Sequence, residues 1–217
     1  MELRVSDAPA EDAAAWLARR LRGAVQRRGR ASLAVSGGST APPMFDALLE
    51  CGVPWEAVEI WQVDERVVPD GHRARNSTQL VVLPATAHPM PVTAPDLDRA
   101  ADDYAAGLPE RFDVVHLGLG EDGHTASWPP GDPVIDSRAQ CAVVGTFNGF
   151  ERMTLTPQVV NGARSRLLLV AGGGKAPMVR RWLLRDPQLP VDRVRRSDTW
   201  AFIDPAAAAQ LPASATG

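Results

Sequence analysis

The residues best suited to chemistry lie in the glycine-rich segment Gly118-Leu119-Gly120-Glu121-Asp122-Gly123-His124, directly after the apolar run of residues 112–117. An imidazole titrates near neutral pH and can take a proton from an attacking water molecule, and a nearby carboxylate can orient its ring. We therefore predict that His124 is a general base. The sequence leaves three carboxylates open as its partner: Asp122, Asp64 and Glu65. His72 and His88 are expected in solvated loops, and His116 as a hydrogen-bonded core residue.

A second glycine-rich segment, Ser36-Gly37-Gly38-Ser39-Thr40, follows the apolar run of residues 33–35. Glycines allow a sharp turn in which consecutive N–H groups point at one anion, and the N-terminus of a following helix favours a phosphate. The hydroxyls of Ser39 and Thr40 add donors. The Gly-Lys-Ser/Thr ending of a Walker loop is absent. A strand-to-helix turn with a Ser/Thr cap is the alternative interpretation.

Lys175 is the only lysine among the 23 Lys and Arg residues, and it directly follows Gly172-Gly173-Gly174. An ammonium is a compact point charge that can approach a phosphate where the planar guanidinium fits less well. We predict that Lys175 contacts an anion. A surface lysine retained by chance is the alternative.

Charged residues also follow the apolar run of residues 58–61, in the order Asp64-Glu65-Arg66. Such charges are costly to desolvate unless they serve one another or a ligand. Asn76 begins a predicted helix, and Arg152 lies in a strand-like segment where it could face an anion. The alternatives are a surface ion-pair cluster, a helix cap at Asn76 and an ordinary edge-strand arginine at Arg152.

Strand-length apolar runs alternate with amphipathic segments along the chain. Strands are predicted at residues 33–35, 58–61, 112–117, 141–144 and 166–171, with a late edge strand at 200–203. Helices are predicted at 10–26, 42–50, 76–83, 97–106, 176–185 and from 205, with a proline-rich loop at 84–95. This alternation predicts an α/β fold, a Rossmann-like, doubly wound, mainly parallel sheet with helices on both faces, in one domain of residues 1–217. Ligands bind such sheets beyond the carboxyl ends of the strands, and each motif directly follows a predicted strand.

Composition excludes several classes of protein. A formal charge of −3 is unlike the basic domains that bind nucleic acid, and no apolar run is long enough to span a membrane. Cys51 and Cys141 form no disulfide framework or metal-ligand pattern and are expected to be core thiols in a reducing compartment. The N-terminus has no apolar signal core, so we expect a cytoplasmic protein.

The motifs together resemble the 6-phosphogluconolactonase family, which is related to glucosamine-6-phosphate deaminase. The resemblance extends over nearly the whole chain, to Asp204-Pro205-Ala206-Ala207. It rests on residues 36–40, Asp64-Glu65-Arg66 with Val68-Pro69, Asn76, residues 118–127, residues 152–156 and Gly174-Lys175.

The resemblance implies a hydrolase without metal or cofactor that opens the six-membered lactone of 6-phosphogluconate in the oxidative pentose phosphate pathway. His124 would activate water, and Arg66 would orient or stabilise the reacting centre. Asp64 lies where the deaminases have a proton-transferring aspartate. Substrate and its phosphate would be held by Ser36, Gly37, Gly38, Ser39, Thr40, Asn76, Arg152 and Lys175. The phosphosugar lactone is the only partner expected of a monomer, with a dimer as the alternative.

Two segments depart from the family pattern. Ser127-Trp128-Pro129-Pro130-Gly131 replaces the usual Ser-Leu-Phe-Pro-Gly, and residues 145–150 lack the usual prolines. Two other functions remain open. A deaminase or isomerase usually carries a glutamate shortly after Asp-Gly-His, whereas the next acid here is Asp132. A sugar-phosphate-binding regulator without turnover would need the 36–40 loop but neither His124 nor Arg66.

Overall fold

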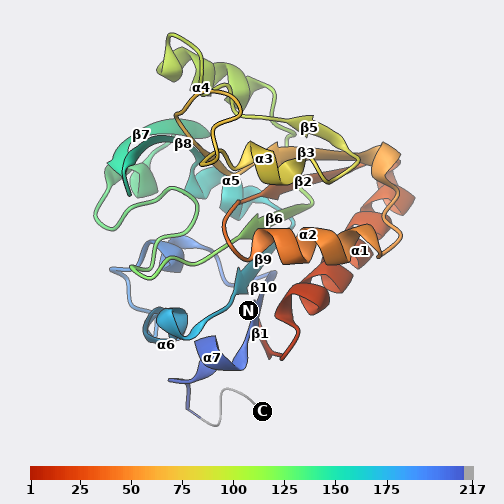
Figure 1. The fold of residues 1–217 in the computed structure, drawn as a ribbon, viewed down its shortest axis with the longest axis vertical. Helices are drawn as coiled ribbons and strands as arrows, with labels where there is room; N and C mark the ends of the chain where they lie inside the picture. The colour runs from red at the N-terminus through yellow and green to blue at the C-terminus, as the bar shows by residue number, and fades with distance from the viewer. Residues whose placement is uncertain (213–217) are drawn as a thin grey trace.

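The structure is a computed structural model that describes residues 1–212, so the last five residues of the predicted domain lie outside it. Its centre is a seven-stranded sheet in the order β1-β10-β9-β6-β2-β3-β5, with every neighbouring pair parallel (Figure 1). These strands are β1 (Glu2–Val5), β2 (Ala31–Val35), β3 (Val58–Gln62), β5 (Thr86–His88), β6 (Val114–Leu117), β9 (Ser165–Val170) and β10 (Thr199–Ile203). The helices are α1 (Pro9–Arg28), α2 (Ala41–Leu49), α3 (Ser77–Leu80), α4 (Leu97–Ala106), α5 (Pro157–Gly162), α6 (Ala176–Leu183) and α7 (Pro205–Ala208).

Two cores cover the two faces of this sheet. The central strands β6 and β9 are buried at every position, because a parallel sheet packs on both sides. Helices α1 and α2 enclose one core, while α4, α5, α6 and α7 contribute to the other. The predicted doubly wound α/β fold with helices on both faces is confirmed.

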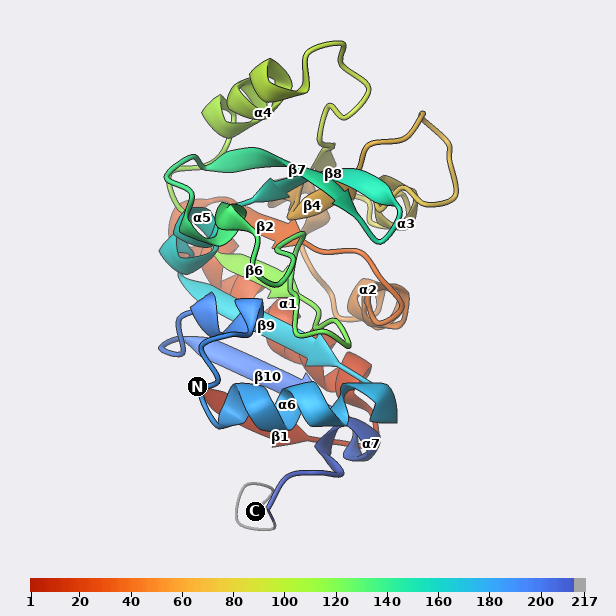
Figure 2. The same cartoon turned by 90° about the vertical axis from the view of Figure 1, so that its left-hand side faces the viewer.

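A second sheet, of three antiparallel strands, packs into one of these cores. Its order is β4-β8-β7, with bounds Asp64–Arg66, Phe150–Leu155 and Cys141–Phe147. In Figure 2 it lies above the parallel sheet, next to α4. The strand predicted at 141–144 is therefore longer than expected and belongs to this separate sheet. Asp64-Glu65-Arg66 form one of its strands and do not lie in a loop after a parallel strand, as the sequence had suggested. Arg152 lies in a strand, as expected.

The remaining differences concern short elements. The strand at 200–203 was expected at an edge, but β10 is interior because β1, which the sequence did not predict, pairs with it. The loop predicted at 84–95 contains the edge strand β5, and the helix predicted at 76–83 shortens to α3. β1 and β5 are short and partly exposed, so neither carries a clear apolar pattern. Among residues 1–212, no helix combines the length and apolar character needed to cross a bilayer.

The strand order places a crevice at the middle of the sheet. β2 and β6 are neighbours, but the chain continues from β2 towards β3 and β5, and from β6 towards β9 and β10. Connections that leave in opposite directions open a space beyond the carboxyl ends of the two strands. Residues 36–40 follow β2 and residues 118–124 follow β6, so these two loops border the same crevice.

Candidate active site

A cavity of about 170 Å³ lies beyond the carboxyl ends of β2, β6 and β9. It collects every residue predicted for the site except Asp122, although these residues come from the small antiparallel sheet and from four segments outside the strands. The predicted residues that line it are Ser36, Gly37, Gly38, Ser39, Thr40, Asp64, Arg66, Asn76, His124, Arg152 and Lys175. Gly118, Leu119, Gly120, Thr125, Ala126, Leu169, Val170 and Ala171 complete the wall.

Asp122 is the carboxylate that partners His124, a choice the sequence left open. Its Oδ1 lies 2.5 Å from His124 Nδ1 and accepts a hydrogen bond from the His124 backbone N–H at 3.1 Å. Burial alone would raise the pKa of Asp122, but the hydrogen bonds and charge of His124 outweigh it and lower that pKa below its usual value. An ionised Asp122 favours the proton on Nδ1, which leaves the Nε2 lone pair available to accept a proton.

The 118–124 loop is shaped to hold this pair. The Gly120 N–H donates to the His124 carbonyl at 2.7 Å, and Thr125 Oγ1 donates to the Gly118 carbonyl at 2.8 Å. A Cβ at position 120 would lie 2.0 Å from His124 Nδ1, so only glycine fits beneath the imidazole. Trp128, which departs from the family pattern, is fully buried and donates to the Leu155 carbonyl at 2.8 Å. This substitution therefore anchors the end of the loop in the core.

The 36–40 loop is held partly by its own neighbours. The Gly38 N–H donates to Gln79 Oε1 at 3.1 Å, so this amide is already satisfied by α3 and not by an anion. In the described part of the chain no side chain caps the N-terminus of α2, which removes the capping role considered for Ser39 and Thr40. Ser36 Oγ is buried without a hydrogen-bond partner among the described residues.

Gly37 is the position in this loop with the least room. A Cβ there would lie 2.2 Å from Asn76 Oδ1, and Asn76 is buried and fixed by its Nδ2, which donates to the Asp64 carbonyl at 2.9 Å. We expect Gly37→Ala to lower phosphate affinity about tenfold, because the loop must move away from Asn76, with a stability loss of about 1–3 kcal/mol. Calorimetric titration with inorganic phosphate and thermal melting would measure the two effects.

The matched control for this variant is Gly162→Ala at the end of α5, where an added Cβ meets nothing within 4 Å. It should bind phosphate as the wild type does. Wild-type phosphate affinity in Gly37→Ala would contradict the role given to the 36–40 loop.

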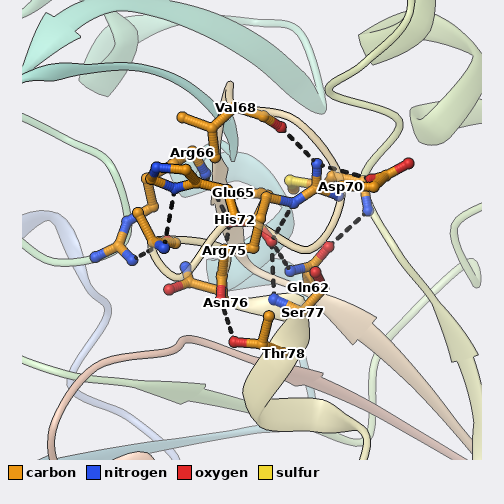
Figure 3. Close-up of polar contacts among 12 residues, drawn as sticks. Gln62, Glu65, Arg66, Val68, Asp70, His72, Arg75, Asn76, Ser77 and Thr78 are labelled. Carbon is orange, nitrogen blue, oxygen red and sulfur yellow. Dashed lines mark hydrogen bonds and ion pairs between the residues drawn. The ribbon is translucent and has the colours of Figure 1, made fainter.

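Glu65 is the residue whose role the sequence indicated least. Its side chain is fully buried, and its two oxygens accept hydrogen bonds of 2.7–2.8 Å from Gln62 Nε2 and from the backbone N–H groups of Arg66, Asn76 and Ser77 (Figure 3). Arg75 Nε adds an ion pair at 3.3 Å. Glu65 therefore joins β4 to the start of α3 and does not partner His124. Arg66 and Asn76 are placed in the cavity wall by this junction.

Three buried polar atoms in the cavity wall lack a hydrogen-bond partner in the part of the chain described. They are Ser36 Oγ, Asn76 Oδ1 and Arg66 Nε. Arg66 is otherwise held by its Nη1, which donates to the Ala74 carbonyl at 2.6 Å. Buried polar groups are nearly always hydrogen-bonded, so a cluster of unsatisfied ones indicates a place for water or a polar ligand.

Two arginines are cross-strand neighbours in the small sheet. Arg66 in β4 pairs with Arg152 in β8, and both line the cavity. Burial, and next the charge of Arg66, lower the pKa of Arg152. Like charges directly opposite on a sheet are destabilising, so this pair favours an anion between or beside the two guanidinium groups. Lys175 lies across the cavity, with its Nζ 4.0 Å from the exposed Glu121 carboxylate.

Asp64 is buried in the same wall. Burial raises its pKa, against the hydrogen bond from Ser127 Oγ at 2.7 Å and the charges of Arg66 and Arg152. Its environment thus differs from that of Asp122, whose pKa is lowered.

The other histidines correct two expectations. His116 is in the core, but both of its ring nitrogens lack a partner among the described residues, and burial lowers its pKa to about 4. His88 is not simply solvated, because its ring stacks on Trp61 at 4.2 Å and its Nε2 lies 3.1 Å from Glu59. Neither ring borders the cavity.

Known proteins resemble this chain over most of its length. The model of the family described as glucosamine-6-phosphate isomerases/6-phosphogluconolactonase matches residues 4–202. A 6-phosphogluconolactonase of Synechocystis is 36% identical over 72% of each chain, and one of Streptomyces coelicolor is 32% identical over 94% of this chain and 91% of its own. The crystal structure of a 6-phosphogluconolactonase from Shewanella baltica superposes with a TM-score of 0.86 at 28% identity, covering 94% and 97% of the two chains. The chain therefore belongs to the glucosamine-6-phosphate isomerase/6-phosphogluconolactonase family.

Proposed function

We propose that the protein is a 6-phosphogluconolactonase, which hydrolyses 6-phospho-D-glucono-1,5-lactone to 6-phospho-D-gluconate. One observation carries the proposal: the His124–Asp122 pair opens onto the same cavity as three cationic side chains, Arg66, Arg152 and Lys175. A base and an anion site in one cavity suit a phosphorylated substrate that is attacked by water. The relatives named above carry the same activity in their names.

The chemical step follows from the tautomer of His124. Nε2 takes a proton from water as the water oxygen attacks C1 of the lactone, and a tetrahedral oxyanion forms. Arg66, a fixed cation in the wall, stabilises this negative charge. The intermediate collapses by breaking the bond between C1 and the ring oxygen, and the imidazolium returns its proton to that oxygen. Asp122 remains ionised throughout and stabilises the imidazolium.

Phosphate binding supports this step from a distance. We assign the phosphate to Arg152, Lys175 and the 36–40 loop, with Asn76 holding the loop in place. Anchoring one end of the substrate fixes the carbonyl against the attacking water, so the binding energy of the phosphate assists the reaction at C1. Asp64, next to Arg66, contributes a polar contact to the sugar.

The two alternative functions are less well supported by the cavity. Among residues 1–212, no glutamate lines the cavity. Asp132, the next acid after His124, instead caps the short helix 133–136 by accepting from the Val134 N–H at 2.8 Å. An amino-sugar deaminase would lack its usual proton-handling glutamate. A regulator that only binds a sugar phosphate would have no use for an oriented base.

The proposal is tested by proton release at fixed pH from freshly made 6-phosphogluconolactone, after subtraction of spontaneous hydrolysis. We expect the wild type to prefer this substrate strongly over gluconolactone, which lacks the phosphate. Lys175→Met should raise KM for the phosphorylated lactone roughly 10- to 100-fold, because a charge-assisted hydrogen bond is lost. It should leave the rate with gluconolactone nearly unchanged.

Arg180→Met serves as the control, since Arg180 is exposed on the neighbouring helix α6 and should not affect either substrate. Equal losses on both lactones in Lys175→Met would remove Lys175 from phosphate binding. No acceleration by folded wild type would overturn the proposed function, and release of ammonia from glucosamine 6-phosphate would replace it with deamination.

The proposal also includes the domain organisation, the oligomeric state and the cellular location of the protein. The chain is expected to act as one domain, as a monomer and in the cytoplasm, where phosphorylated sugars are found. A dimer is the alternative oligomeric state.

A further inference from the structure

Phe147 contacts both the proposed general base, His124, and the proposed phosphate-binding residue Arg152, although it does not line the cavity. Its ring lies edge to face with the His124 imidazole, with centroids 4.9 Å apart and an interplanar angle of 86°. The Arg152 guanidinium carbon lies 5.5 Å from the centre of the same ring. The Phe147 carbonyl accepts hydrogen bonds from Arg152 Nε and Nη2 at 3.2 and 3.0 Å.

We propose that Phe147 is a positioning residue that fixes the general base and the phosphate-binding arginine relative to each other. The inference rests on the roles proposed above for His124 and Arg152. The Phe147 carbonyl holds one edge of the Arg152 guanidinium. The Phe147 ring restricts rotation of the His124 imidazole, which the hydrogen bond to Asp122 alone does not fix.

The hairpin between β7 and β8 is built to place this residue. Val144 pairs with Arg152 and Phe147 pairs with Phe150, so β7 carries one residue more than β8 between these two pairs. This bulge shifts the alternation of β7 and brings Phe147 to the same face as Arg152. Without it, Phe147 would point to the opposite side of the sheet.

The tip of the hairpin is a tight turn. Asn148 and Gly149 both have positive φ, 49° and 82°, as a two-residue hairpin turn of the primed type requires. The segment of residues 145–150 that lacks the prolines usual in the family is therefore an ordered hairpin end. The ring of Phe147 is only half-buried, so its replacement should not unfold the protein.

The experiment compares Phe147→Leu with Phe150→Leu, which removes the other aromatic ring of the same hairpin. Phe150 faces His72, with centroids 6.3 Å apart, and contacts neither His124 nor Arg152 through its ring. Phe147→Leu should lower kcat on both lactones roughly 3- to 10-fold, as expected for loss of an aromatic pair. Phe150→Leu should keep the wild-type kcat, and Phe147→Tyr, which retains the ring, should restore it.

The second arm needs no turnover, so it separates this inference from the proposed function. Calorimetric titration with inorganic phosphate should show a roughly 2- to 5-fold weaker affinity in Phe147→Leu, the size of a lost cation–π contact. Nuclear magnetic resonance of the histidine rings should show the signal of His124 displaced in Phe147→Leu and unchanged in Phe150→Leu.

Several results would overturn the inference. Equal losses in Phe147→Leu and Phe150→Leu would show that the hairpin acts only as structure. An unmoved His124 signal together with wild-type phosphate affinity would show that the ring positions neither partner. If Phe147→Leu and Phe147→Met both fail to fold while Phe150→Leu folds, Phe147 is a stability residue and the inference fails. If the wild type hydrolyses no lactone but the phosphate and imidazole effects are seen, only the proposed function fails.

Discussion

Replacement of His124 by glutamine is expected to lower kcat for 6-phosphogluconolactone by roughly 10²- to 10⁴-fold, the usual contribution of a positioned general base. Glutamine is similar in length and remains polar, but it cannot take a proton from water. KM should change little, because the phosphate contacts assigned to Arg152, Lys175 and the 36–40 loop remain. Proton release at fixed pH, with the spontaneous rate subtracted, measures both constants.

The control for this variant is His72→Gln, because the ring of His72 packs near Phe150 and does not border the cavity. It should hydrolyse the lactone at the wild-type rate. The pKa of Asp122 is lowered, so this carboxylate stays ionised to lower pH than a free aspartate, and loss of its charge should not limit the wild-type rate at mildly acidic pH. Retention of more than about a tenth of the rate by His124→Gln would exclude the base role.

Replacement of Glu65 by glutamine should lower the free energy of unfolding by about 3–5 kcal/mol, because it breaks a fully buried ionic junction. Both carboxylate oxygens accept hydrogen bonds from the backbone or from Gln62, and Arg75 pairs with Oε2. A glutamine offers only one acceptor atom, and its NH₂ group would face N–H donors. Urea unfolding followed by circular dichroism gives the difference.

Glu59→Gln is the matched control, since the Glu59 side chain is 41% exposed and its carboxylate pairs with the similarly exposed His88. Its effect on unfolding should be below about 1 kcal/mol, as for other surface ion pairs. If Glu65→Gln unfolds at the same urea concentration as Glu59→Gln, the junction between β4 and α3 does not depend on the carboxylate.

The sequence predicted the centre of the fold better than its borders. β2, β6 and β9 are buried on both faces, so they appear as continuous apolar runs, and the loops that follow them carry the glycines and polar residues of the site. β1 and β5 lie at the edges, where exposed positions interrupt the apolar pattern. The small sheet was missed because its pairing joins Asp64–Arg66 to Phe150–Leu155, which no local pattern specifies.

The sequence predicted which residues form the site, but not which of them pair with one another. His124 and Asp122 are two residues apart, yet Asp64 and Glu65 appeared equally suitable until the geometry separated them. Glu65 stayed open as a partner of His124 because nothing in the sequence reveals that Asn76 and Ser77 fold back on it. The effect of Phe147 depends on one extra residue in β7, a shift that appears only once the two strands are paired.

The strand β1 covers one edge of the parallel sheet. Residues 2–5 pair with residues 200–203 of β10, whose sequence is Thr-Trp-Ala-Phe-Ile. Without β1, the unpaired backbone N–H and C=O groups of β10 could form hydrogen bonds with a strand of another molecule. β1 itself ends the sheet with Glu2 and Arg4, exposed charges that discourage further growth. Residues 2–5 thus cover the edge that β10 would otherwise expose, and this pairing can form only after residues 200–203 have been synthesised.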